Sequence, residues 1–394
     1  MRRPLTWRIL ACAGALWAVA TATPALAQAP SRKAEREVLD VSDSAVREAV
    51  TGGIDFLLAD QNEDGSWGGV TNATMTSGFA NPMTYHCWDV GTTALATKAL
   101  LKLASGEAAE KAVERGLDFL IENADLKRPA EWDVDNVWGL VYGLDTLATT
   151  LKHPRYTGTD RGAEIRTAAE TMIRGLERYA SPRGGWGYYA NPNANWMPEW
   201  ATSFTTAVGV IALVEAQEAG LEVPSKLLRA GVKSIERCRQ PNGAFSYSVN
   251  AIPRHLSMES INQIKGSLGR IQVCNYALSR AGAEVPDAVA ETGIQQFFKH
   301  HKFLDVGRNK PIPHEAYYAV AAYFYLFGHY YAAEVIDTMP ETPRVRYGQL
   351  LRHEILKCRQ KDGSFWDFWI ASNTKPYGTA FSILSLANTI EVWN

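Results

Sequence analysis

The sequence predicts an all-α fold: a single (α/α)6 toroid of six helical hairpins, with amphipathic helices outside and apolar helices inside. One observation is a short motif of glutamine, an Asn/Asp-Gly turn and a large aromatic residue, which starts at Gln61, Gln240 and Gln360. The copies are 179 and 120 residues apart, close to three and two multiples of a period of about 60 residues. A second observation is that no stretch alternates between apolar and polar residues as a half-buried strand would.

A period of about 60 residues predicts six units, and three further segments agree with it. "SPRGGWGYY", starting at Ser181, repeats the turn and the aromatic residue with serine in place of glutamine. Near residues 121 and 300, "AVERGLDFLIEN" and "AVAETGIQQFFKHH" match "AVTGGIDFLLADQ", the helix before the first motif. The motif residues that we expect to be structural are Gln61, Gly65, Trp67, Trp186, Gln240, Gly243, Phe245, Gln360, Gly363 and Phe365.

Each unit is predicted to hold two helices. The first has apolar residues at three-four spacing, as in Ile54, Leu57 and Leu58, which is typical of an amphipathic outer helix. It ends in the turn, where glycine supplies a positive φ. The second is apolar nearly all round, which predicts burial inside the ring. The six inner segments are "DVGTTALATKALLKLA", "DNVWGLVYGLDTLATT", "TSFTTAVGVIALVEAQ", "GRIQVCNYALSRAG", "EAYYAVAAYFYLFGHYYAAEV" and "YGTAFSILSLAN".

The chain divides into three predicted segments. Residues 1–27 have a basic start, an apolar run from Ile9 to Ala20 and Ala25-Leu26-Ala27 before the cleavage site, the pattern of a secretory signal peptide. We therefore expect export to the periplasm or the extracellular space. Residues 28–42 are predicted to be a flexible leader and residues 43–394 to form the toroid. No apolar run reaches the roughly 20 residues that a membrane-spanning helix needs.

Composition excludes some partners and leaves the redox state open. The net charge is −2 over 394 residues, with no basic stripe, so no nucleic-acid partner is expected. Four cysteines lie beyond the signal peptide, an even number in a compartment that permits disulfides. Their pairing is open; they are Cys87, Cys238, Cys274 and Cys358.

The repeated Q-x-(D/N)-G-x-(W/F) motif resembles the QW-type motif of the terpenoid cyclase and protein prenyltransferase superfamily. The resemblance covers essentially all of residues 43–394 and implies the α/α toroid of the squalene cyclase and prenyltransferase repeat. It also implies cyclase- or transferase-like activity on an isoprenoid. No known catalytic motif of these enzymes is intact, since "DVDN" at Asp133 departs from D-x-D-D-T and no D-x-C zinc pair occurs. Carried over by resemblance, Asp135 would be the proton donor and Asp133 its neighbour.

The starts of the inner helices should gather at one rim of the toroid, where acidic, histidine and aromatic residues are frequent. The candidate catalytic residues are Asp135, Asp133, His86 and Glu199, and the candidate cavity residues are Trp88, Trp132, Tyr142, Trp200 and Tyr317. A carboxylate at a helix start can equally cap the helix, and an aromatic can equally pack. Zinc needs three or four ligands, for which His86, His255 and His314 are candidates.

Three functions follow from these residues. The first is an exported toroid that binds an apolar or isoprenoid-like ligand in its central cavity, with or without transforming it. The alternative is a carbohydrate-active α/α barrel, a lyase or hydrolase, using Glu131, Asp135 and Glu199 with tryptophan platforms. The third is a non-catalytic binding or interaction scaffold. A closed aromatic cavity would favour the first and a long polar groove across the rim the second. A plugged barrel with every acid bonded to a helix N-terminus would favour the third.

Overall fold

The computed structural model describes residues 39–69, 82–127, 135–188, 200–249, 260–369 and 374–393. Within these ranges the chain forms thirteen α-helices, and its β-pairing is confined to isolated bridges. The predicted all-α class is therefore confirmed. The predicted signal peptide and most of the leader lie outside the described residues. None of the described helices combines the length and the apolarity that crossing a bilayer would require.

Helices alternate between an outer and an inner layer along the chain. The outer helices are α1 (Asp43–Asp60), α3 (Glu107–Glu122), α5 (Asp160–Arg178), α7 (Ser225–Cys238), α9 (Asp287–Lys299) and α12 (Glu341–Leu356). The inner helices are α2 (Pro82–Leu103), α4 (Asn136–Leu151), α6 (Ser203–Glu218), α8 (Leu268–Arg280), α11 (Tyr325–Asp337) and α13 (Thr374–Ala387). The short helix α10 (Lys302–Arg308) and a 3-10 turn, η4 (Ala322–Phe324), lie in the connection from α9 to α11.

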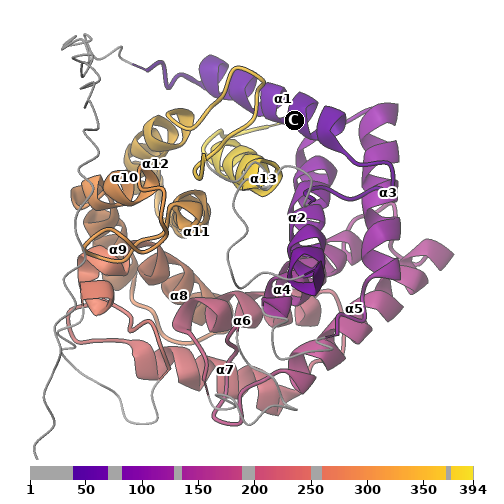
Figure 1. Ribbon diagram of the computed structural model, residues 1–394, viewed down its shortest axis with the longest axis horizontal. Helices are drawn as coiled ribbons and strands as arrows, with labels where there is room; N and C mark the ends of the chain where they lie inside the picture. Colours follow the sequence, from indigo (N-terminus) through magenta and orange to yellow (C-terminus); the bar gives the residue numbers. More distant parts are fainter. Residues whose placement is uncertain are drawn as a thin grey trace, which may run out of the picture. The chain divides into compact units, whose positions relative to one another are not determined.

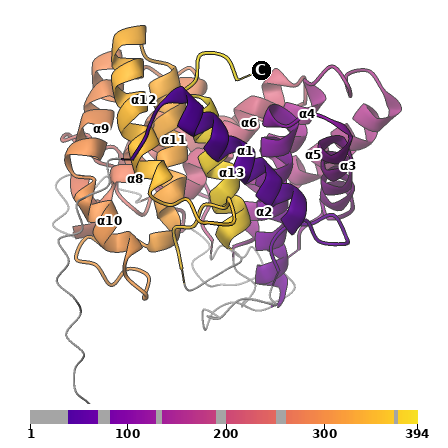
Figure 2. The same cartoon turned by 90° about the horizontal axis from the view of Figure 1, so that it is seen from above.

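The inner helices close into a ring within the compact unit Leu39–Asn394 (Figure 1). They contact one another in the order α2, α4, α6, α8, α11 and α13, and α13 returns to contact α2. Figure 2 shows α1 crossing the outside of this closure, against α13 and α2. The arrangement confirms the predicted toroid of six hairpins, with α10 as an addition to the fifth.

The repeated motif is structural, because it joins each turn to the inner helix that follows. Gly65 has a φ of 87° in the turn that follows α1. The buried Trp67 indole donates to the Leu57 carbonyl at 2.8 Å, and its backbone N–H donates to Thr93 Oγ1 of α2 at 3.0 Å. Trp186 repeats the indole contact with Leu176 at 2.8 Å.

The glutamine of the motif plays different parts in different copies. Gln61 donates from Nε2 to the Ala112 carbonyl of α3 at 2.9 Å, which ties the first hairpin to the next. Gln240 Nε2 donates to the Asn262 carbonyl at 3.2 Å. Among the described residues, Gln360 Nε2 donates only to the carbonyl of Cys358, two residues away, at 2.9 Å. The clamp between outer helices is therefore specific to the first copy.

Aromatic rings fill the centre of the toroid. Trp138 of α4 packs on Phe204 of α6 and on Tyr142, with ring centroids 6.0 Å apart in both pairs. Phe327 of α11 lies 6.3 Å from Trp138 and 6.3 Å from Phe381 of α13. These five residues, called the aromatic plug below, come from four of the six inner helices.

The fifth inner helix is shorter than the sequence predicts. The segment from Glu315 was expected to be helical, but α11 begins at Tyr325. His314 and Ala319 have φ values of 65° and 54°, which a right-handed helix cannot contain. His314 Nδ1 and the Ala319 carbonyl are 2.7 Å apart and close this loop. As a result Tyr317 is 77% exposed, which corrects the prediction that it lines the cavity.

The four cysteines beyond the leader are buried thiols. Burial raises the pKa of Cys238 and of Cys358 to about 12, so both stay protonated near neutral pH. The open question of their pairing is thereby answered for the folded chain, which forms no disulfide among them.

Candidate functional site

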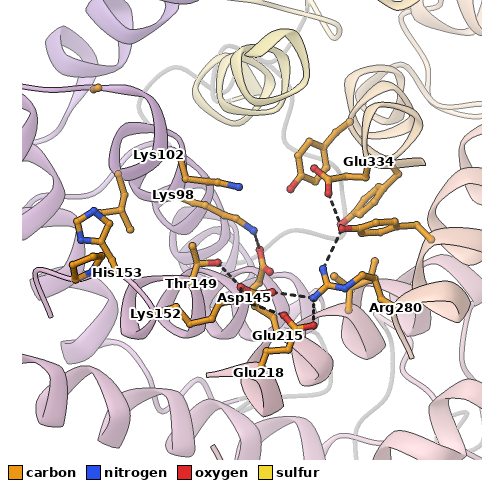
Figure 3. A pocket seen from close by; sticks show the side chains of 17 residues that line it. Lys98, Lys102, Asp145, Thr149, Lys152, His153, Glu215, Glu218, Arg280 and Glu334 are labelled. Carbon is orange, nitrogen blue, oxygen red and sulfur yellow. Dashed lines mark hydrogen bonds and ion pairs between the residues drawn. The ribbon is translucent and has the colours of Figure 1, made fainter. Parts of the chain in front are cut away.

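A polar pocket of about 810 Å³ lies at the C-terminal ends of the inner helices (Figure 3). We call it the polar pocket. It receives side chains from α2, α4, α6, α8 and α11, so it lies on the inside of the ring. Its charged lining residues are Lys98, Lys102, Asp145, Lys152, Glu215, Glu218, Arg280 and Glu334. The remaining ones are Leu101, Ala104, Thr149, His153, Pro154, Ile211, Tyr276, Tyr330 and Tyr331.

Helical spacing brings these polar groups together. Asp145, Thr149 and Lys152 follow one another at intervals of four and three residues, and so lie on one face of α4. Glu215 and Glu218 repeat the three-residue interval at the end of α6. Because the inner helices run side by side, their last turns present these faces to a common space.

Glu215 stands at the centre of the pocket's ion pairs. Its Oε1 lies 2.6 Å from Lys152 Nζ and accepts from Thr149 Oγ1 at 3.1 Å, while its Oε2 lies 3.2 Å from Arg280 Nη2. Burial alone would raise the pKa of Glu215, but Lys152, Lys98 and Arg280 outweigh it and hold the pKa at about 2. Glu215 is therefore an anion near neutral pH, able to accept hydrogen bonds but not to donate a proton.

The polar contacts continue from helix to helix around the ring. Arg280 of α8 donates to the Tyr276 hydroxyl at 3.1 Å, and that hydroxyl donates to Glu334 Oε2 of α11 at 2.7 Å. Glu334 Oε1 accepts from Asn388, just after α13, at 3.2 Å. The indole of Trp393 then donates to the Leu103 carbonyl at the end of α2 at 2.9 Å. With the pair of Lys98 and Asp145 between α2 and α4 and the ion pairs of Glu215, these contacts run from α2 round to the end of α13. We call them the polar girdle.

At the opposite ends of the inner helices, the structure brings two predicted site residues together. The Trp88 indole donates to Asp135 Oδ2 at 3.1 Å. Asp135 is the residue before α4, has a φ of 66° and makes no side-chain cap to the helix. The Asp135 carboxylate is therefore directed at a tryptophan rather than at the helix start.

The other predicted residues of this rim are dispersed or lie beyond the described part. Asp133, Glu199, Trp132, His255 and Glu131 lie outside the described residues. His86 is half-buried with its ring 6.3 Å from that of Phe119, and burial lowers its pKa. Trp200 packs edge-on against Tyr188 at 4.7 Å. Tyr142 belongs to the aromatic plug.

Neither described histidine candidate for zinc belongs to a metal-like cluster. Among the described residues, the group with metal-ligand geometry is His301, Asp305 and Glu354. His301 Nδ1 lies 3.2 Å from a carboxylate oxygen of each of the other two. Lys357 bonds the same oxygen of Glu354, so a protein cation already neutralises that carboxylate. The zinc prediction gains no support from the structure.

Two carboxyls with raised pKa values lie away from the polar pocket. Burial raises the pKa of Asp89, which accepts the Gly69 N–H at 2.9 Å, to about 7. Burial raises that of Asp367, which accepts the Leu326 N–H at 3.0 Å, to about 7 as well. The groups best suited to hold a proton at neutral pH are thus separate from the pocket.

Sequence reasoning missed the polar pocket because it searched the starts of the inner helices. A signal was available, since Lys98, Asp145 and Glu215 are isolated charges in otherwise apolar segments. A charge on a helix that is buried all round needs a partner, and partners on neighbouring helices would indicate a shared polar site. The predicted site residues belong to the opposite end of the ring from this pocket.

Comparisons with known proteins identify the fold. No family model and no curated protein matches the sequence. An inactive variant of an alpha-1,6-mannanase of Salegentibacter sp. HEL1_6, in complex with alpha-1,6-mannotetrose, is 10% identical and has a TM-score of 0.57 over 88% of this chain and 99% of that one. The unsaturated glucuronyl hydrolase of Bacillus sp. GL1 is 11% identical with a TM-score of 0.57 over 87% of this chain and 96% of that one.

A type II terpene cyclase from Scytonema is also similar, at 14% identity and a TM-score of 0.48 over 87% of this chain and 96% of that one. At these identities the first two comparisons show a shared α/α toroid and nothing finer.

Proposed function

We propose that this chain is a carbohydrate-active toroid that binds a saccharide in the polar pocket. The observation that carries the proposal is the character of that pocket, about 810 Å³ in volume and lined by ionic and hydroxyl groups at the ring's inner edge. Binding pockets for small molecules usually measure about 300–1,000 Å³. A ligand rich in hydroxyls offers the donors and acceptors that such a lining requires.

The centre of the ring is less suited to an isoprenoid. The aromatic plug occupies the axis, and the apolar pocket beside it, lined by Phe204, Leu268, Phe324 and Phe327 among others, measures about 50 Å³. A chain of several isoprene units needs a cavity several times larger. An apolar ligand, the first function inferred from the sequence, is therefore less well supported than the saccharide.

Glu215, the carboxylate at the centre of the pocket's ion pairs, is suited to binding rather than to acid catalysis. Glycoside hydrolysis needs one carboxyl that is protonated at the working pH. Glu215 does not meet this need, because its pKa is about 2. It can instead accept sugar hydroxyls, while Lys152 and Arg280 on either side of it can donate to ring and hydroxyl oxygens.

Two further points agree with a saccharide. The fold is shared with a mannanase that binds alpha-1,6-mannotetrose and with a glucuronyl hydrolase. The predicted signal peptide would bring the toroid into contact with polysaccharides outside the cell. Export is part of the proposal, and release of residues 1–27 from the secreted protein, detected by intact mass, would test it.

The binding test needs a variant that blocks the pocket without breaking its ion pairs. Ala104 lines the pocket directly after α2, and Ala104→Trp should fill part of it. Calorimetric titration with neutral, acidic and amino-bearing oligosaccharides should show binding that Ala104→Trp weakens by about tenfold or more. Asp135→Asn, at the other end of the ring, serves as the matched control and should bind as the unaltered protein does. Loss of binding in Asp135→Asn with retention in Ala104→Trp would move the site to the opposite rim.

A further inference from the structure

We propose that the polar pocket selects a zwitterionic saccharide, with a negatively charged group at Lys102 and a positively charged amino group at Glu334. The inference rests on the proposed function and names the class of saccharide. It follows from the way in which the pocket's charges are paired, which leaves one cation and one anion without an ionic partner among the described residues.

Most charges of the pocket are matched within the protein. Lys98 pairs with Asp145 at 2.6 Å. Lys152 lies 2.6 Å from Glu215 and 3.2 Å from Glu218, and Arg280 lies 3.2 Å and 2.7 Å from the same two carboxylates. His153 accepts the Arg155 N–H on Nδ1 at 3.3 Å, which requires a lone pair on that nitrogen. None of these groups needs a charge from a ligand.

Lys102 is different. It lies one turn after Lys98 on α2 and reaches into the pocket (Figure 3). Within the part of the chain that the structure describes, it makes no hydrogen bond and no ion pair. Its side chain is open to the water of the pocket mouth, yet the surrounding walls and then the ammonium of Lys98 lower its pKa. An anionic group bound beside it would relieve both effects.

Glu334 is the complementary group on the other side of the pocket (Figure 3). Its two oxygens accept hydrogen bonds from the neutral donors Tyr276 and Asn388, and no ion pair reaches it among the described residues. Glu334 is near enough to raise the pKa of Lys102 but is not within ion-pair distance of it. The two charges therefore face each other across a gap.

The ligand class follows from filling that gap. A neutral sugar would displace water from both charged groups and offer them only uncharged hydrogen-bonding partners in exchange. A purely acidic sugar would satisfy Lys102 but bring its charge towards Glu334. A saccharide that carries a carboxylate and a free amine would satisfy both through charge-assisted hydrogen bonds. An alternating uronic acid and amino sugar chain has this chemistry.

The decisive probes differ in the charged groups that they carry. They are a tetrasaccharide of alternating glucuronate and free-amine glucosamine, the same tetrasaccharide with its amines acetylated, and a neutral cello-tetraose. We expect calorimetric titration to show the free-amine form binding at least about tenfold more tightly than the acetylated form. Its affinity should fall as salt is raised from 20 to about 300 mM, because the contacts are ionic and partly exposed. The neutral probe should be insensitive to salt.

Two variants assign the groups. Lys102→Met should weaken binding of the two probes that carry carboxylates by about tenfold or more and leave the affinity for the neutral probe unchanged. Glu334→Gln, which keeps an acceptor for Tyr276, should remove the preference for the free amine over the acetylated form. Lys111→Met on α3, at a lysine whose side chain is 71% exposed, is the matched control and should change nothing.

The outcomes separate the two proposals. Equal affinity for all three probes would refute the zwitterion selectivity while leaving saccharide binding intact. A preference that survives both Lys102→Met and Glu334→Gln would place the selecting charges elsewhere and would also refute it. Failure of every probe to bind would refute the proposed function and the selectivity with it.

Discussion

The ammonium of Lys98 lies 2.6 Å from Oδ2 of Asp145, and the two side chains are buried between α2 and α4. Burial alone would lower the pKa of Lys98, but Asp145 outweighs it and the pKa is raised. The pair is the first contact of the polar girdle and holds two neighbouring inner helices in register. It is therefore a place where the stability of the ring can be tested directly.

Removing one member of this pair should be more damaging than removing both. Lys98→Met leaves the Asp145 carboxylate buried without its cation, which costs about 3–5 kcal/mol of unfolding free energy. The double variant Lys98→Met/Asp145→Leu removes both charges and should recover most of that loss. Urea unfolding followed by circular dichroism measures each value. A double variant as unstable as the single one would show that the cost comes from packing instead.

Two glycines of the repeated motif offer a matched comparison. Gly65 and Gly243 have φ values of 87° and 85°, so alanine is strained equally at both. At Gly65 a Cβ atom would also lie 2.8 Å from the carbonyl carbon of Arg115 in α3, whereas at Gly243 it would meet nothing within 4 Å. We expect Gly243→Ala to cost about 1 kcal/mol and Gly65→Ala distinctly more. Thermal unfolding of the two variants measures the difference, and equal losses would mean that α3 can shift aside.

Each indole contact of the motif should contribute the free energy of one hydrogen bond to the stability of the fold. Trp67→Phe keeps most of the buried ring but leaves the Leu57 carbonyl without the indole donor, and Trp186→Phe does the same to Leu176. Each substitution should cost about 1–3 kcal/mol. The two sites belong to different hairpins, so the double variant should lose the sum of the two single losses. Denaturant titration of all three would reveal any coupling between the hairpins.

Asp367 should make stability depend on pH. It is 2% exposed, its Oδ1 has no hydrogen-bond partner in the described part of the chain, and its pKa is raised to about 7. The folded protein therefore keeps a proton that the unfolded chain releases near pH 4. Stability due to this group is present at low pH and is lost as the pH rises from about 4 to about 7.

Asp367→Asn should abolish that dependence. The amide oxygen can still accept the Leu326 N–H, and the side chain carries no charge to bury. Between pH 4 and pH 8 the variant should gain about 2–4 kcal/mol relative to the unaltered protein. Asp287→Asn, at an exposed acid in the first turn of α9, is the control. Parallel stability curves for Asp367→Asn and the unaltered protein across this pH range would contradict the prediction.

The helical hairpins could be predicted because each rests on a local rule. Apolar residues at three-four spacing and a glycine with positive φ after the last turn require no knowledge of distant contacts. Trp67 and Trp186 could be assigned a packing role for the same reason, since the repeat itself identifies them. The start of α11 could not be predicted from its run of tyrosines. His314 and Ala319 adopt left-handed φ values although neither is a glycine, so the sequence gives no sign of the loop.

The location of the polar pocket could not be deduced from one helix at a time. The role of Asp145 is clear only when Lys98 is known to lie on the adjacent helix. That of Glu334 is clear only when its hydrogen-bond donors prove to be the neutral side chains of Tyr276 and Asn388. The Trp88–Asp135 contact, in contrast, joins two residues that the sequence had already singled out. A role of Asp135 in acting on a ligand stays a prediction, which the binding measurement on Asp135→Asn tests.

The contact between the two ends of the helical ring has a consequence for circular permutation of the chain. Arg47 of α1 donates to the Trp393 carbonyl at 3.1 Å, so the beginning and the end of the toroid lie together. Joining them with a short linker and opening the chain at the exposed turn after α6, beside Gly220, would give a protein with the same neighbours in a different order. Because the hairpins form a closed ring, we expect the permuted chain, which begins with the hairpin of α7 and α8, to fold into the same toroid.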